Sequence, residues 1–517
     1  MNKYNQLFLL LLVSNYSYAN SVDLTVNNYL APISDTLSAI VFFSIPILGA
    51  NVPLIVLWLA CAAAFFTCYL KFINLRGFTH AFQLIRGDYC NPKAKGEISH
   101  FQAVATAISG TVGVGNIGGV AIAISIGGPG ATFWLIFAGF LSMSTKLVEC
   151  TLGVMYRRQH KNGSVSGGPM YYLEHGLTEK GWPRLGKTMG VFYALAMVVG
   201  CLGIGNMFQS NQAYIQFVNI TGGEQSFFGE NSWLFGLLIS TTVAVVIIGG
   251  IHSIARVAER IVPLMASLYV VSAIIVISFN YQFLPTAVEL IINGAFSPEG
   301  ITGGMVGVII IGFQRALFSN EAGLGSASIA HSAVKTNDPA SEGIVSLLEP
   351  FIDTIVICTL SSLVIITTAI PYGLMDSDLQ GIELTSAAFA YHIRWFPYPL
   401  ALAALLFAFS TSIAWSYYGL KSWTYLFGDK KISQLIFKAI FCLFIALGCM
   451  IQLDSIIKIS DALVFIIAIP NILGLYILAP NVRQELNQYM YKLKTGKLKN
   501  YRTSQSQVQT TGIEVSH

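Results

Sequence analysis

Glycines are concentrated in one apolar stretch of the chain, from Ala107 to Gly119, where the sequence is AISGTVGVGNIGG. Each glycine disfavours a helix by about 0.8–1 kcal/mol relative to alanine, so we expect the middle of this stretch to unwind. Unwound backbone that is buried away from water needs a partner for its N–H and C=O groups. The stretch therefore predicts a ligand site, although close helix packing through Gly115 and Gly119 explains the same glycines.

A second apolar stretch, residues 312–325, is interrupted by polar and ionisable side chains. Such residues are expensive inside a membrane and are functional candidates by default. We expect Arg315 and Glu321 to act in a gating or structural ion pair, with each other or with other charges such as Glu149 or Lys146. The four candidates in this stretch are Gln314, Arg315, Asn320 and Glu321.

A third polar patch lies between Ala408 and Gly419. The hydroxyls of Thr411 and Ser412 are hard oxygen ligands of the kind that small cations require. Hydroxyls in membrane helices also commonly bond back to their own helical turn, which is the alternative explanation.

These three patches lie in a chain of 517 residues that is 54% hydrophobic and only 10% charged, with a mean hydropathy of +0.64. Typical soluble domains contain about 25% charged residues, so the composition excludes an ordinary soluble enzyme. The net charge of +4 is small and the basic residues form short clusters, which argues against nucleic-acid binding. Most of the 8 cysteines lie in apolar runs, and their spacing indicates neither disulfides nor a metal centre.

Apolar runs long enough to cross a membrane predict an all-α polytopic protein with about eleven transmembrane helices. The loops predicted at 218–232 and 281–302 contain glutamates but no lysine or arginine, so we expect them outside. This orientation places the N-terminus in the periplasm or outside the cell and the C-terminus in the cytoplasm, with the protein in the inner membrane. The predicted spans are 51–73, 102–125, 130–155, 190–217, 233–251, 262–280, 303–323, 345–370, 398–420, 434–452 and 459–480.

Breaks at matching places in two groups of five helices indicate an inverted repeat with a binding site near the membrane midplane. The predicted units are a possible signal peptide or N-terminal extension at 1–19, an extra helix at 51–73, repeats at 102–280 and 303–480, and a cytoplasmic tail at 481–517.

Several motifs make the chain similar to the alanine or glycine:cation symporter family, within the larger group that has the LeuT-type fold. The resemblance covers roughly residues 50–485. It rests on GEISHFQA (96–103), GVGNI (113–117), IGGPGAT (126–132), KLVECTLG (146–153), GGPMYY (167–172) and FSNEAGLGSA (318–327).

The resemblance implies particular binding residues. The freed N–H groups of Val114 and Gly115 would meet a substrate carboxylate, since helix N-termini favour anions. Trp415 would cap a small side-chain pocket. Gln209 would add a polar contact, for which Gln212 and Asn206 are alternatives. The implied substrate-binding set is Val114, Gly115, Gln209, Phe313, Leu317, Thr411 and Trp415.

The resemblance also implies one cation site, formed by the carbonyls of Ser109, Val112 and Ala408 and the hydroxyls of Thr411 and Ser412. A second LeuT-type site would use Thr111 and Asn116, and we expect it to be unused. The residues with an expected gating or structural role are Asn116, Arg315, Asn320 and Glu321.

The predicted function is secondary active symport by alternating access, in which inward Na⁺ movement drives uptake of alanine, glycine or serine. The alternative within the family is a Na⁺- or H⁺-coupled glutamine transporter; a non-transporting channel or sensor and a membrane-embedded enzyme are less favoured. We expect no cofactor and no metal beyond Na⁺, with membrane lipid as a partner and the monomer as the functional unit. His252 and His331 are placed at inner loops, where histidines are usually solvated.

Overall fold

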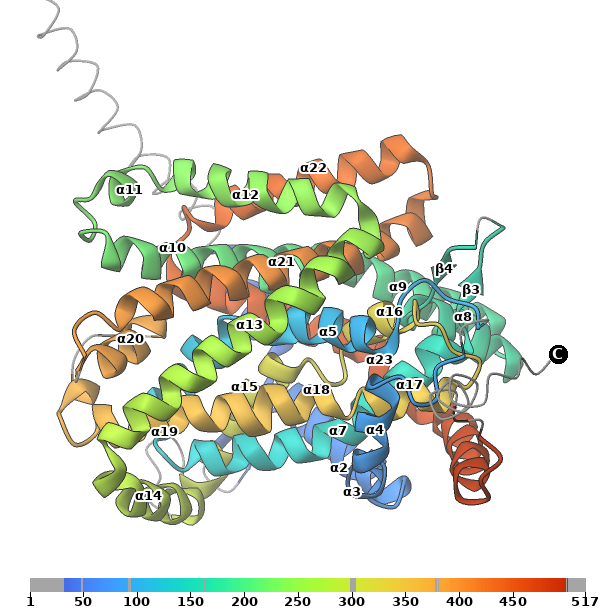
Figure 1. Ribbon diagram of the computed structural model, residues 1–517, viewed down its shortest axis with the longest axis horizontal. Helices are drawn as coiled ribbons and strands as arrows, with labels where there is room; N and C mark the ends of the chain where they lie inside the picture. The colour runs from blue at the N-terminus through green and yellow to red at the C-terminus, as the bar shows by residue number, and fades with distance from the viewer. Residues whose placement is uncertain are drawn as a thin grey trace, which may run out of the picture.

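The computed structural model describes residues 32–500, apart from 48–49, 92–93, 162, 298–303, 377–378, 380, 392 and 499. The possible signal peptide at 1–19 lies outside the described residues, as do residues 501–517 of the tail. Figure 1 shows long helices that run nearly side by side, with α11, α14 and α20 at one end and β3, β4 and α8 at the other.

The helices account for every predicted span. Seven are long and apolar enough to cross a membrane, a bent pair forms a further candidate, and three shorter apolar helices lie at predicted spans. The chain is therefore a multi-pass membrane protein; the count of eleven stays a prediction. In the first group these segments are α5 (His100–Thr111), η1 (Gly115–Gly119), α6 (Val120–Gly127), α7 (Ala131–Met155), α9 (Pro183–Leu202), η2 (Gly203–Met207), α10 (Phe208–Ile220), α12 (Ser232–Ile248) and α13 (Gly250–Phe279).

The second group begins with α15, which ends at Asn320, so that the non-helical residues 321–325 separate it from α16. Its next span contains a π-helix, η4, between two α-helical parts. The bounds are α15 (Gly304–Asn320), α16 (Ser326–His331), α17 (Pro339–Val345), α18 (Leu348–Pro350), η4 (Phe351–Cys358), α19 (Thr359–Ala369), α21 (Pro397–Phe427), α22 (Lys431–Gly448) and α23 (Leu453–Lys494).

Short elements cover the two ends of the bundle. The helix α2 (Leu54–Tyr69) precedes both groups and packs against α7. The others are α3 (Ile73–Arg76), α4 (Phe78–Ile85), α8 (Pro169–Glu179), α11 (Phe227–Glu230), η3 (Tyr281–Phe283), α14 (Leu284–Phe296), η5 (Leu374–Asp376) and α20 (Ile382–Ala390). The strands β1 (Ser44–Ile47) and β2 (Ala50–Pro53) form one antiparallel hairpin, and β3 (Arg158–Gln159) and β4 (Val165–Ser166) form another.

Burial separates the central helices from the peripheral ones. The helices α12 and α22 pack on each other along one side of the bundle (Figure 1). They expose large apolar side chains such as Leu237, Val245, Leu435 and Leu443. By contrast, residues 141–154 of α7 are all buried. An apolar exterior around a polar interior is what a membrane requires, because lipid offers no hydrogen-bond partners.

Candidate functional site

The first broken helix lies at the centre of the bundle. Ser99 and Gln102 form a capping box that begins α5, and α5 ends at Thr111. The chain continues as η1 and α6 after a bend of 54°, and residues 103–121 are all buried. The unwinding predicted from the glycines is confirmed.

The second broken helix faces the first. Glu321 begins the break with a left-handed backbone (φ 57°), which is uncommon for a residue other than glycine. Neighbouring helices satisfy the backbone of the break. The Gly325 N–H donates to Glu149 Oε1 at 2.9 Å, and Asn471 Nδ2 donates to Glu149 Oε1 and to the Gly323 carbonyl, both at 2.8 Å.

Three of the predicted substrate residues meet at the first break. The Val114 N–H donates to Gln209 Oε1 at 3.1 Å, and Gln209 Nε2 donates to the Ile204 carbonyl at 3.0 Å. A β-carbon at Gly113 would lie 2.9 Å from both Gln209 Oε1 and Thr411 Oγ1, so these two oxygens flank the same point of the backbone. Within the described part of the chain, the buried Thr411 hydroxyl has no hydrogen-bond partner. Gln209 therefore accepts the hydrogen bond of the Val114 N–H group, which we predict to bind a substrate carboxylate.

The two alternatives to Gln209 are engaged elsewhere. Asn206 Nδ2 donates to the Phe441 carbonyl at 2.7 Å, and Gln212 Nε2 donates to Asn211 Oδ1 at 3.3 Å. Gln209 bonds to the break at Val114, whereas Gln212 Oε1 lies beside η1, 3.1 Å from where a β-carbon at Gly118 would stand.

Trp415 connects the two broken helices. Its Nε1 donates to Glu321 Oε1 at 2.9 Å and lies 3.3 Å from the Gly110 carbonyl. A β-carbon at Gly205 would lie 2.0 Å from Trp415 Cγ, so the π-helix η2 passes the indole at a distance that only glycine permits. The indole is therefore held in place on both sides. Phe313 and Leu317 are buried one helical turn apart on α15, and their contact with substrate stays a prediction.

The predicted cation residues lie where α5 and α21 touch. Ser109 Oγ donates to the Ser410 carbonyl at 2.6 Å, which joins the end of α5 to the middle of α21. Ala408 and Ser412 are buried on α21, and Val112 is buried at the end of α5. Whether these groups bind a cation stays a prediction.

A carboxylate that the sequence analysis missed lies beside Asn116. Asp353 belongs to η4 and is fully buried. Its oxygens accept hydrogen bonds from Asn116 Nδ2, from Ser319 Oγ at 2.9 Å and from Thr354 Oγ1 at 2.8 Å. Asn320 Nδ2 in turn donates to Thr354 Oγ1 at 3.1 Å. Asn116 and Asn320, predicted as gating residues, thus belong to one polar cluster around Asp353. A lone aspartate in the predicted span 345–370 was the signal that could have identified it.

Arg315 forms an ion pair, as expected, but with a partner that the sequence analysis did not name. Arg315 forms an ion pair with Asp461 on α23, and Gln314 Nε2 donates to the same carboxylate at 3.3 Å. The guanidinium also lies 5.4 Å from the centre of the Phe318 ring. Glu321 instead accepts hydrogen bonds from Trp415 and, at 2.6 Å, from Ser326 Oγ. Sequence spacing gave no sign of Asp461, because α23 follows Arg315 by more than a hundred residues.

The expectation that His331 is a solvated loop residue is wrong. His331 ends α16, is fully buried and bonds to Glu342 through Nδ1 at 2.6 Å and to Glu349 through Nε2. Glu349 also lies 3.3 Å from the buried Lys146 ammonium. The other histidine, His252, is 63% exposed at its side chain, as expected.

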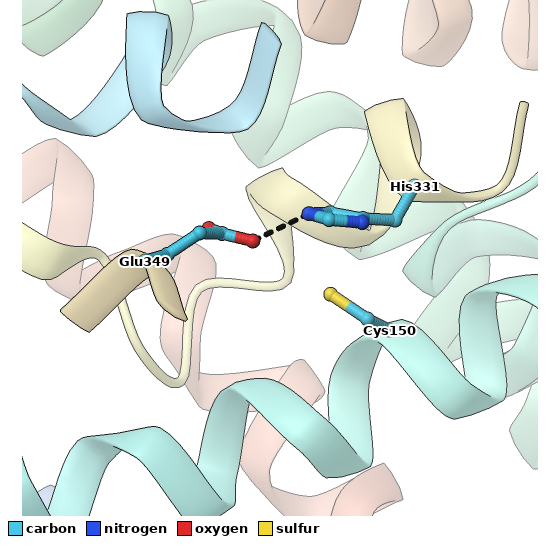
Figure 2. A group of neighbouring side chains, drawn as sticks. All are labelled: Cys150, His331 and Glu349. Atoms are coloured by element: carbon cyan, nitrogen blue, oxygen red, sulfur yellow. Dashed lines mark hydrogen bonds and ion pairs between the residues drawn. The ribbon is translucent and has the colours of Figure 1, made fainter. Parts of the chain in front are cut away.

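His331, Glu349 and Cys150 bring potential metal ligands within 4.8 Å of one another (Figure 2). Both ring nitrogens of His331 face carboxylates, to which they donate protons, so neither has a lone pair to offer a metal. The adjacent Lys146 ammonium further disfavours a cation. This group is therefore better described as an ion-pair network than as a metal centre.

Known proteins resemble the chain over most of its length. Residues 37–503 match the Sodium:alanine symporter family. The sodium/alanine symporter AgcS of Methanococcus maripaludis is 36% identical over 84% of this chain and 94% of its own. The probable sodium/glutamine symporter GlnT of Bacillus subtilis is 32% identical over 86% of this chain and 89% of its own. The crystal structure of MhsT in complex with L-phenylalanine has the same LeuT-type fold, with a TM-score of 0.55, 17% identity and coverage of 76% of this chain and 93% of MhsT.

Proposed function

We propose that this chain, which belongs to the sodium:alanine symporter family, couples inward Na⁺ movement to uptake of a small neutral amino acid. The family consists of transporters, so the chain is not an enzyme. The observation that carries the proposal is that two broken helices meet around three polar groups. These groups are the Thr411 hydroxyl, which has no hydrogen-bond partner among the described residues, the Gln209 amide and the buried Asp353 carboxylate.

The substrate carboxylate would bind at the Val114 and Gly115 N–H groups. Gln209 now accepts from the Val114 N–H, and its amide must move aside when a carboxylate takes that place. The Thr411 hydroxyl, which has no partner among the described residues, would then bond to the zwitterion. An unpaired buried hydroxyl is unfavourable by about 1–3 kcal/mol, and a ligand that pairs with it recovers this free energy.

Aromatic rings restrict the space around the first break. Trp415 is fully buried between Gly110, Glu321 and Gly205, with no room to move toward η2. Phe318 and Phe208 pack edge to face, 5.4 Å apart, on the other side of Gly115. We therefore expect alanine, glycine and serine to enter and larger side chains to be disfavoured.

Na⁺ would bind near Asp353. A carboxylate buried away from water is unfavourable unless a positive charge or hydrogen bonds compensate it. Among the described residues, Asp353 accepts hydrogen bonds from neutral amide and hydroxyl groups. The carboxylate oxygens of Asp353 and the hydroxyl oxygens of Ser319 and Thr354 are hard ligands that suit Na⁺. The predicted group at Ser109, Val112, Ala408, Thr411 and Ser412 lacks a carboxylate, so we place the coupling ion first at Asp353.

Transport would follow from alternating access between the two helix groups. Because Asn116 follows the Val114–Gly115 backbone directly and bonds to Asp353, cation and substrate would bind next to each other. If Na⁺ raises substrate affinity by some factor, substrate raises Na⁺ affinity by the same factor. One Na⁺ moving inward across 100 mV contributes about 2.3 kcal/mol to accumulation. We place the protein in the inner membrane with its C-terminus in the cytoplasm.

The test is uptake of labelled L-alanine into proteoliposomes with an inward Na⁺ gradient, against the same vesicles in choline. We expect accumulation that requires Na⁺ and that glycine and serine inhibit. Thr411→Ala should abolish it, while Thr424→Ala, further along α21, should not. Alanine uptake that is absent with Na⁺, while labelled glutamine accumulates, would overturn the assigned substrate class; uptake of neither would overturn the symport proposal.

A further inference from the structure

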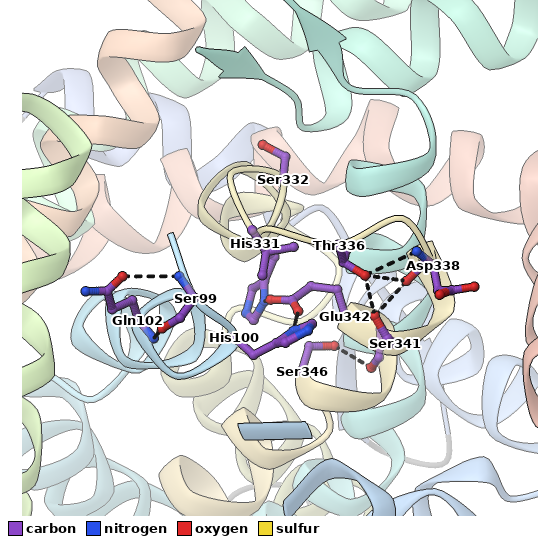
Figure 3. A network of polar contacts seen from close by, with 12 residues as sticks. Ser99, His100, Gln102, His331, Ser332, Thr336, Asp338, Ser341, Glu342 and Ser346 are labelled. Atoms are coloured by element: carbon purple, nitrogen blue, oxygen red, sulfur yellow. Dashed lines mark hydrogen bonds and ion pairs between the residues drawn. The ribbon is translucent and has the colours of Figure 1, made fainter. Parts of the chain in front are cut away.

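Five buried ionisable side chains form a continuous line at the end of the bundle that we place in the cytoplasm. His100 bonds to Glu342, Glu342 to His331, His331 to Glu349, and Glu349 pairs with Lys146. Each side chain is at most 3% exposed. Figure 3 shows His100 and His331 on opposite sides of the Glu342 carboxylate. We call these five residues the inner chain.

The contacts of the inner chain fix its protonation. With Glu342 and Glu349 ionised, as their cationic neighbours favour, each carboxylate accepts hydrogen bonds, and the His100 Nδ1 and both His331 nitrogens that face them carry protons. His331 therefore has a proton on both nitrogens and is a cation. Glu342 is shared between two imidazole rings, which favours the charged form of His100 as well.

At the cytoplasmic end of the bundle, which we call the inner face, α5 meets α16 and α17. The residues of the inner chain lie on both sides of this contact. His100 is the first residue of α5, whereas Glu342 lies on α17 and His331 on α16. Main-chain bonds join the same segments: the Glu97 N–H donates to the Ala333 carbonyl at 2.7 Å, and the Lys335 N–H donates to the Ile98 carbonyl at 2.8 Å. Movement of α5 away from α16 and α17 would break these bonds and separate His100 from Glu342.

Arg157 reinforces this closure. Its guanidinium donates to the carbonyls of Lys95, Ser332, Val334 and Thr336 at 2.5–2.9 Å, and so ties the segment before α5 to the segment after α16. The inner face is thus closed by bonds to the segment that precedes His100 in the chain.

We propose that His100 and Glu342 form a proton-binding site, and that closing the inner face takes up one proton from the cytoplasm. This proposal rests on the alternating-access part of the proposed function. In the closed state the Glu342 carboxylate holds the proton on His100. Once the face opens, His100 stands in water at a helix N-terminus, which disfavours a cation, and an imidazole in water is mostly neutral above about pH 6.5. The proton leaves from the ring nitrogen to water, and reclosure binds it again.

The sign of the pH effect follows from proton linkage. Because the closed state binds more protons, acid favours closure, and this advantage is lost as the pH rises above about 6.5. One proton changes the open-to-closed ratio by at most tenfold per pH unit. The other ionisable groups around His100 are His331 on α16, Glu349 on α18, Lys146 on α7, Arg157 after α7, Glu259 on α13, His80 on α4 and Cys90 after α4.

In the closed state, Glu342 bonds to His100 and His331, and His331 bonds to Glu342 and Glu349. The named groups outside the inner chain form no such bond with His331 or Glu342. His331 keeps its two carboxylates when α5 moves, since Glu342 and Glu349 do not lie on α5. His100 is therefore the group whose proton should follow closure.

Hydrogen–deuterium exchange of the full-length protein in lipid nanodiscs tests the proposal. The amides of Glu97 and Lys335 are bonded only across the closed face, so their exchange, corrected for the chemical rate, reports opening. We expect opening to rise severalfold to tenfold per unit between pH 6.5 and 8 in the wild type. His100→Gln should remove this slope, and His175→Gln, at an exposed histidine, should keep it.

A corrected exchange rate that is independent of pH in the wild type would overturn the proposal, as would a slope that survives in His100→Gln. If His100→Gln does not fold, Glu342→Gln removes the other half of the site and must give the same loss. The experiment uses no amino acid, so its failure leaves the uptake result of the proposed function unaffected. A failed uptake test with a pH-dependent closure would instead overturn symport alone.

Discussion

The two ends of the central site are closed in different ways. On the side that we place outside, one ion pair between Arg315 and Asp461 lies over Phe318, with side chains 9% and 5% exposed. On the opposite side, the inner chain, the Arg157 contacts and main-chain bonds join several helices. The outer side also has neutral hydrogen bonds from α20, with Thr385 Oγ1 donating to the Ile117 carbonyl at 3.2 Å and Ser386 Oγ accepting from Gln216 Nε2 at 3.0 Å. Because the inner side is joined by a line of buried ions and by main-chain bonds, we expect outward opening to require less free energy than inward opening.

The largest expected effect is on the inner side. Lys146→Met removes the ammonium next to Glu349 and leaves this buried carboxylate with His331 as its remaining partner in the inner chain. Breaking a buried pair in this way destabilises a protein by about 3–5 kcal/mol. The free energy of unfolding in detergent, followed by tryptophan fluorescence, should fall by this amount. Lys187→Met is the matched control, because its side chain is 57% exposed and pairs with Glu174 at the surface. An equal loss in both variants would show that the inner chain is not a special source of stability.

An intermediate effect is expected on the outer side. Asp461→Asn removes the charge that holds Arg315, and a hydrogen bond to a charged group contributes about 1.5–3 kcal/mol. The population open to the outside should then rise about tenfold or more. The readout is the rate at which a cysteine at position 317, introduced as Leu317→Cys, reacts with a membrane-impermeant thiol reagent added outside.

The control for this experiment is Gln314→Ala, which removes a neutral donor to the same carboxylate. It should change the labelling rate much less. A labelling rate that is unchanged in Asp461→Asn would mean that the outer ion pair does not close the pathway.

The smallest effect concerns a surface pair at the inner end. Burial alone would raise the pKa of Glu174, but the hydrogen bond from Tyr425 and the nearby Lys187 ammonium outweigh it and lower the pKa below its ordinary value. The stabilisation is therefore complete above about pH 4.3 and is lost as the pH falls through the lowered value. The free energy of unfolding of the wild type should exceed that of Glu174→Gln by at most about 1 kcal/mol at pH 7, and the difference should shrink as the pH falls below about 4.3.

Thermal unfolding scans between pH 7 and 3 measure this difference, with Glu224→Gln, an exposed glutamate at the other end, as the control. A stability difference that grows as the pH falls would contradict the assigned direction of the pKa.

Much of the fold could be predicted from the sequence, because lipid imposes simple rules on it. Apolar runs identified the helices that are long and apolar enough to cross a membrane, and the glycines at 110–119 identified the break after α5. Gln209 lies at the break, where the family resemblance places it, and its contact with the substrate stays a prediction. These features depend on residues that are close together in the sequence, so composition and motifs predict them.

Pairings between distant residues could not be read from the sequence. Glu321, Glu149 and Lys146 were the charges named as candidate partners of Arg315, but its partner is Asp461 on α23. His331 ends a short helix that is buried in the core, whereas hydropathy alone places this residue in a loop. Asp353 could have been noticed as the one aspartate in the predicted span 345–370, but its contact with Asn116 could be seen only in the structure.

The measurement that tests the central claim most directly is equilibrium binding of labelled L-alanine at increasing Na⁺ concentration. The wild type and Asp338→Asn, a control at an exposed pair with Lys492, should bind alanine more tightly as Na⁺ rises. Asp353→Asn should bind weakly at every Na⁺ concentration and show no such increase. Alanine affinity that still rises with Na⁺ in Asp353→Asn would contradict a cation site at this carboxylate and return the coupling ion to the α5–α21 contact.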